Sequence, residues 1–163
     1  MASLPEAVPS SIPREPKAKT KTNNTVEKKQ PEDIITYYNT RSAGFPITFE
    51  VALEWANRIL VQRKSKRLLT TAPTDRGNVL LTLDKAVKEA GGIECNFFGP
   101  PGPNGWEHYL LVMGEEVGNF YKINGEMPPG SELVDPEGEE IGKKLLAQEG
   151  IEHGPFTTCF YDF

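Results

Sequence analysis

The chain has 163 residues, 37% hydrophobic and 25% charged, which fits one soluble domain with some unstructured extension. Its apolar runs are only a few residues long, and this excludes a membrane-spanning helix, which needs about 20 apolar residues. The net charge of −5 is uneven, with +3 in residues 1–30, +1 in residues 31–106 and −9 in residues 107–163, so any contact with nucleic acid is confined to the N-terminal half.

Residues 1–31 contain five prolines and no aromatic residue. They cannot bury enough apolar surface to offset the entropy lost on ordering, so we predict a disordered, basic, Pro-rich tail. A single domain is predicted from residue 32 to residue 163. The tail lacks the apolar core of a secretory signal and the acid-free, arginine-rich face of an import signal. The predicted location is therefore the cytosol, with the nucleus as an alternative.

The domain opens with apolar, β-forming residues at positions 34–38, typical of an edge strand or a docking segment. Gly44 and Pro46 then predict a loop. Thr48 is placed to cap a helix that runs to about Lys64, because apolar residues recur there at i, i+3 and i+4. The apolar stripe consists of Phe49, Ala52, Leu53, Ala56, Ile59 and Leu60.

Basic residues gather at the end of this first helix. They are Arg58, Arg63, Lys64, Lys66 and Arg67. Cations at a helix C-terminus complement the helix dipole, so a solvated helix end accounts for them. A patch that binds an anion or a partner is the alternative. Trp55 also has two interpretations, because at the edge of the apolar stripe it can flank the core or contact a partner.

A second helix is predicted from about residue 74 to residue 90, with Gly91 as its C-terminal stop. Apolar residues recur through it at helical spacing. A brief apolar run does not by itself distinguish helix from strand. A strand through residues 79–83, followed by a short helix from Asp84, therefore stays open as an alternative.

Two strands are predicted around a Pro/Gly-rich loop. Residues 93–98 alternate between apolar and polar, which is the pattern of a half-buried strand. Residues 99–105 are too rich in proline and glycine for regular structure. Residues 106–113 are apolar on both faces, which predicts a central strand covered on both sides.

The rest of the domain is predicted as a hairpin, a helix and a final strand. Residues 114–118 are interpreted as a hairpin connection and residues 119–123 as the returning strand, completing a three-stranded meander that ends at the turn Asn124-Gly125. Asp135 and Pro136 favour a helix start, with the helix running to Gly150. Residues 156–163 are rich in β-formers. The predicted fold class is α+β, with an antiparallel sheet of three to five strands packed against two or three helices.

No catalytic, metal or nucleotide-binding motif stands out in the sequence. The residues with metal-binding chemistry are Cys95, His108, His153 and Cys159, but their spacing does not match a zinc site. A thiol nucleophile paired with a histidine base is a further alternative. We predict buried free thiols, no metal and no cofactor.

The Pro/Gly loop and the basic helix end are the candidate binding surfaces. Trp106 beside a stiff loop offers a large contact area at low entropy cost, although it can instead fill the edge of the core. We predict a non-enzymatic interaction or regulatory protein that binds a macromolecule, in the first place another protein. The candidate binding residues are Asn104, Trp106 and His108 on the loop rim and Arg63, Lys64, Lys66 and Arg67 at the helix end.

Two other functions stay open. One is a small cytosolic enzyme with its site near His108, using Glu107 and Tyr121. Adjacent residues of a regular strand point to opposite faces, so Glu107 and His108 would need a bulge to share a pocket. The other is RNA binding through the basic tail and helix end, with an affinity that falls steeply as salt rises.

Overall fold

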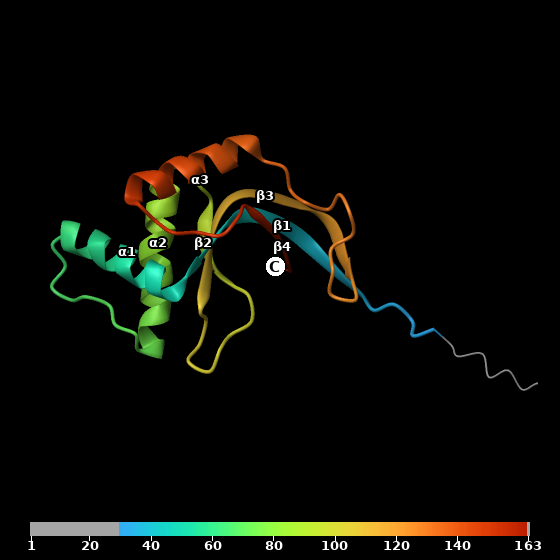
Figure 1. Ribbon diagram of the computed structural model, residues 1–163, viewed down its shortest axis with the longest axis horizontal. Coiled ribbons are helices and arrows are strands. Elements are labelled where there is room, and N and C mark those ends of the chain that lie inside the picture. The colour runs from blue at the N-terminus through green and yellow to red at the C-terminus, as the bar shows by residue number, and fades with distance from the viewer. Residues whose placement is uncertain (1–29, 163) are drawn as a thin grey trace, which may run out of the picture. The chain divides into compact units, whose positions relative to one another are not determined.

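The computed structural model describes residues 30–162, and the chain divides between Glu32 and Asp33. The elements of the second unit are β1 (Ile35–Thr48), α1 (Phe49–Gln62), the 3-10 helix η1 (Pro73–Asp75), α2 (Arg76–Glu89), β2 (Glu94–Phe98), β3 (His108–Ile123), α3 (Pro136–Glu149) and β4 (Thr157–Tyr161). The strands form one antiparallel sheet in the order β2-β3-β1-β4 (Figure 1). The predicted α+β fold is thereby confirmed. The disordered tail was predicted for residues that, apart from positions 30 and 31, lie outside the described range.

β1 is longer than predicted. It starts in the apolar run at residues 34–38 but continues to Thr48, so the loop predicted through Gly44 and Pro46 is wrong. Gly44 lies at a register shift, where a Cβ would come 2.0 Å from the carbonyl oxygen of Leu111. Pro46 lies beyond the stretch that pairs with β4, where β1 has β3 as its partner. A strand tolerates proline at such a position.

β3 is one continuous strand, so the hairpin predicted at residues 114–118 and the meander built on it are wrong. β3 pairs with β1 along its whole length, from Thr48 opposite His108 to Ile35 opposite Ile123. The glycine at position 114 serves close packing instead of a turn, because a Cβ there would lie 2.4 Å from a carboxylate oxygen of Asp135. The turn at residues 124–125 is confirmed, with backbone hydrogen bonds on either side of it.

The helix boundaries follow the predicted caps. Thr48 accepts a hydrogen bond from the Val51 amide at 3.4 Å, and Asp135 accepts one from the Gly138 amide at 2.9 Å. Gly150 ends α3 in the left-handed conformation, with φ at 65°. α2 occupies residues 76–89, which makes the alternative strand through residues 79–83 wrong. None of the helices in residues 30–162 has both the length and the apolarity needed to cross a membrane.

The core lies between the helices and one face of the sheet. Tyr109 and Leu111 of β3 face the helices, whereas Leu110 and Val112 lie on the opposite face and are equally buried. The prediction that this strand is covered on both faces is therefore confirmed. Figure 1 shows that β1 and β3 are strongly bent. One pocket is lined both by Phe97 of β2 and by Tyr161 of β4, the two edge strands, which also indicates that the sheet curls over its second face.

Trp55 belongs to this core. Its side chain is 1% exposed and is among the largest fully buried ones in the described residues. Of its two interpretations, the core position is the one the structure shows.

Cys95 of β2 is also buried, and desolvation raises the pKa of its thiol. Cys159 of β4 is partly buried, and desolvation raises its pKa as well. Both thiols are therefore protonated at neutral pH.

Candidate functional site

A cleft of about 880 Å³ opens between the start of α1, the segment before η1 and the end of the Pro/Gly loop. We call it the α1–loop cleft. Its lining includes Thr48, Phe49, Glu50, Leu53, Glu54, Asn57, Thr71, Ala72, Pro73, Arg76, Asn104, Glu107 and His108. Its volume lies in the range of about 300–1,000 Å³ that is usual for ligand sites.

Three of the predicted site residues meet in this cleft. Asn104, Glu107 and His108 all line it. No bulge is needed to bring Glu107 and His108 to one pocket, because β3 starts at His108 and Glu107 belongs to the preceding loop. The Phe49 amide donates to the Glu107 carbonyl at 2.8 Å, which fastens the loop end to the start of α1.

Trp106 and Tyr121 do not line the cleft. The Trp106 indole stacks on the Phe97 ring, with the centroids 5.4 Å apart and an interplanar angle of 12°. This contact holds the loop against β2 and leaves the indole partly buried. Tyr121 lies at the other end of β3 from His108, beside Tyr37, with the ring centroids 6.4 Å apart. The structure therefore does not bring Tyr121 together with Glu107 and His108.

The basic residues of the α1 end are also separate from the cleft. Arg63, Lys64, Lys66 and Arg67 are exposed, and none of them lines it. Arg63 lies 3.5 Å from a carboxylate oxygen of Glu89, and Arg67 lies 2.8 Å from one of Asp75. These two arginines thus have acidic partners within the domain, which lowers the positive charge available to a partner.

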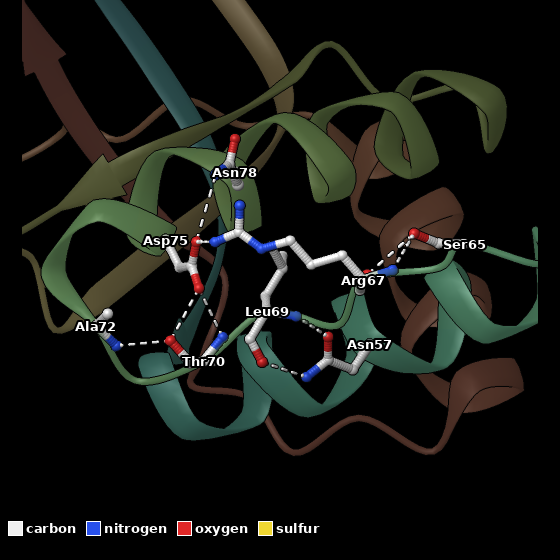
Figure 2. A network of polar contacts seen from close by, with 8 residues as sticks. All are labelled: Asn57, Ser65, Arg67, Leu69, Thr70, Ala72, Asp75 and Asn78. Atoms are coloured by element: carbon white, nitrogen blue, oxygen red, sulfur yellow. Dashed lines mark hydrogen bonds and ion pairs between the residues drawn. The ribbon is translucent and has the colours of Figure 1, made fainter.

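The segment between α1 and α2 is fastened by the network in Figure 2. Asp75 is 1% exposed and accepts hydrogen bonds from the amide and hydroxyl of Thr70 at 2.8 and 2.9 Å, and from Arg67. Asn57 of α1 bonds both the amide and the carbonyl of Leu69, at 2.8 and 2.9 Å. The bonds from Thr70, followed by the charge of Arg67, hold the pKa of Asp75 below its ordinary value. Because the same segment continues into the cleft wall, this network supports the cleft.

Asp75→Asn is expected to destabilise the fold in a pH-dependent way. The pKa of Asp75 is lower in the folded chain than its ordinary value of 3.8, so the carboxylate stabilises the fold fully above that pH. The contribution is lost as the pH falls through the lowered pKa. Urea denaturation at pH values on both sides of 3.8 should show a lower midpoint for Asp75→Asn at neutral pH and a narrowing gap in acid. Glu140→Gln, on the exposed face of α3, is the control, and a gap independent of pH would contradict the prediction.

Arg76, the first residue of α2, is a cleft residue that sequence reasoning missed. It is 8% exposed, and its guanidinium carbon lies 3.8 Å from the centre of the Phe49 ring. Nη1 donates to the Trp106 carbonyl, whereas Nε is buried without a hydrogen-bond partner. No carboxylate of residues 30–162 forms an ion pair with it. One signal was present in the sequence, because a cation is unfavourable at a helix N-terminus and its presence there needs a reason.

No protein-family model, curated protein or solved structure matches this chain. The function is therefore inferred from the cleft itself. Residues 30–162 contain no cluster of three His, Cys, Asp or Glu side chains that could hold a metal ion. The cleft instead combines a buried guanidinium with exposed carboxylates, an amide and an imidazole, groups that bind ligands through ion pairs and hydrogen bonds.

Proposed function

We propose that the chain is a non-enzymatic interaction protein that binds an extended basic segment of a partner protein in the α1–loop cleft. The observation that carries this proposal is the gathering of three exposed carboxylates, Glu50, Glu54 and Glu107, around one cleft. Complementary charge across an interface steers association and rejects partners of like charge. The cleft therefore favours lysine- and arginine-bearing ligands over acidic ones.

The shape of the surface supports an extended ligand. A second, shallower groove runs along α1 and shares Glu54 and Asn57 with the cleft. It continues past Arg58 to Val61, which is 61% exposed. Cleft and groove together form a track along the helix, and a peptide segment several residues long fits such a track better than a compact metabolite.

The loop side of the cleft is held in place before any ligand binds. The Trp106–Phe97 stack and the bond from Phe49 to the Glu107 carbonyl fix its end, and the prolines of residues 100–103 restrict its backbone. A surface that is already ordered loses little conformational entropy on binding. This supports a role for Asn104 and His108 as fixed contacts for the partner.

An enzyme site in the same cleft is the second candidate, because Glu107 and His108 both line it. Both side chains are exposed, and the third predicted member, Tyr121, lies at the far end of β3. Binding is therefore better supported. An enzyme would convert its ligand, so peptides recovered chemically unchanged after incubation with the protein count against this candidate.

RNA binding through the α1 end has weaker support, since Arg63 and Arg67 already have acidic partners.

Charge reversal around the cleft tests the proposed function. The variant Glu54→Lys with Glu107→Lys is expected to weaken binding of a fluorescent lysine-rich peptide about tenfold, equivalent to about 1.4 kcal/mol. Each replaced carboxylate removes an attraction and adds a repulsion. Fluorescence anisotropy at several salt concentrations measures the affinity, which should fall with salt. Glu140→Lys, which changes the net charge away from the cleft, is the control. Equal weakening by this control would show nonspecific charge attraction and would contradict the proposal.

A further inference from the structure

The charge of Arg76 is only partly compensated within the domain. Its guanidinium packs on Phe49 and donates to the Trp106 carbonyl, but no carboxylate of the described residues pairs with it and Nε has no partner. Burying a charge is costly unless it is paired and hydrogen-bonded. A guanidinium that lines a cleft without a carboxylate partner is suited to receiving an anionic group from outside.

The surroundings of Arg76 add to the attraction for an anion. The cleft is bordered by the first residues of α1, and the N-terminus of a helix carries partial positive charge. Asp75 precedes Arg76 but its carboxylate is turned to Thr70 and Arg67, and it makes no capping bond to α2. The nearest acidic residue in sequence therefore does not neutralise the site.

The other charges of the cleft limit which ligand can supply the anion. Glu50, Glu54 and Glu107 are exposed, whereas Arg76 is 8% exposed. A wholly anionic ligand such as a nucleotide would meet three carboxylates. A wholly cationic ligand would leave Arg76 unmatched. A ligand that ends in one oxyanion and carries positive charge beside it satisfies both sets of groups.

We propose that Arg76 receives the terminal carboxylate of the bound segment, so that the α1–loop cleft takes the C-terminal end of a basic partner chain. This inference rests on the proposed function and adds the direction and the end group of the ligand. The planar guanidinium matches a carboxylate through parallel N–H donors, which lysine cannot reproduce. The basic side chains that precede the terminus then lie against the glutamates of the cleft, and the backbone of the segment continues along the groove on α1.

The experiment compares two fluorescein-labelled peptides, Lys-Lys-Leu-Lys-Leu with a free C-terminus and the same peptide as its C-terminal amide. By anisotropy, the wild-type protein is expected to bind the free acid at least tenfold more tightly than the amide. Arg76→Met should abolish this difference and Arg76→Lys should restore only part of it. Arg63→Met, which lies outside the cleft, should preserve it. The wild-type comparison needs no variant, so it remains decisive even if Arg76→Met fails to fold.

The outcomes separate this inference from the proposed function. Equal affinity for acid and amide, with both still weakened by Glu54→Lys with Glu107→Lys, overturns the carboxylate assignment and leaves the proposed function standing. Binding of neither peptide overturns both. Inorganic phosphate is added as a competitor to identify the oxyanion. Displacement of acid and amide alike by millimolar phosphate would indicate a phosphate site at Arg76 and would also overturn the assignment.

Discussion

Replacing Gly44 by alanine is expected to lower the free energy of unfolding by about 4 kcal/mol or more, or to prevent cooperative folding altogether. The added Cβ would lie 2.0 Å from the carbonyl oxygen and 2.7 Å from the carbonyl carbon of Leu111. Both are backbone atoms of β3, so no side-chain rotation relieves the overlap. β1 and β3 must separate instead, at the point where Gly44 pairs with Val112. Because β1 also pairs with β4, the damage spreads across the sheet.

Gly77→Ala is the matched control for this prediction. Position 77 lies in α2, and a Cβ there would meet no atom within 4 Å. Alanine is favoured over glycine in a helix by about 0.8–1 kcal/mol, so this variant should be more stable than the wild type. Urea denaturation followed by circular dichroism measures both variants. A Gly44→Ala domain within about 1 kcal/mol of the wild type would contradict the strand pairing described above.

Trp55→Ala is expected to cost about 3–5 kcal/mol of unfolding free energy, because it removes a large side chain from the closed core and leaves a cavity. The indole is 1% exposed and packs within the cluster formed by α1, α2 and the sheet. Its Nε1 is buried without a hydrogen-bond partner, so the lost stability comes from packing and apolar burial. Removing the indole therefore breaks no hydrogen bond of Nε1.

Two further variants sharpen the Trp55 prediction. Trp55→Phe keeps most of the apolar volume and removes the buried N–H, so its loss should be well below that of Trp55→Ala. Val61→Ala, on the exposed side of the same helix, should change stability by no more than about 0.5 kcal/mol. Trp106 remains as a fluorescent reporter in all three variants. If Trp55→Ala were as mild as Val61→Ala, the core position of Trp55 would be contradicted.

The sequence predicted the helices well because their signals are local. Thr48, Asp135 and Gly150 mark helix ends through contacts within a few residues of themselves, and the structure confirms all three. The glycines of the strands could not be interpreted in the same way. Gly44 and Gly114 resemble turn residues, but they are small because Leu111 and Asp135 approach them from distant parts of the chain. The residues next to each glycine in the sequence give no signal that Leu111 or Asp135 will pack against it.

The candidate site was predicted in part for the same reason. The Pro/Gly composition indicated the loop, and Asn104, Glu107 and His108 do line a cleft. Tyr121 was grouped with His108, but the predicted hairpin that would fold residues 119–123 back beside residues 106–113 does not form. The continuous β3 places it at the opposite end instead. The position of Arg76 depends on Phe49 and Trp106, which only the tertiary fold brings to it.

The sheet order β2-β3-β1-β4 also has a consequence for how the chain folds while it is being synthesised. β1 has no partner until β3, which follows both α1 and α2, has left the ribosome, and its second neighbour, β4, is the last strand of the described residues. Pairings between distant segments form slowly, and a strand that waits for its partner exposes hydrogen-bonding edges to other nascent chains. Ile35 and Tyr37, exposed even in the finished domain, would be open to such contacts throughout. Translation speed and chaperone supply should therefore govern the yield of folded protein more than they do for a domain built from consecutive hairpins.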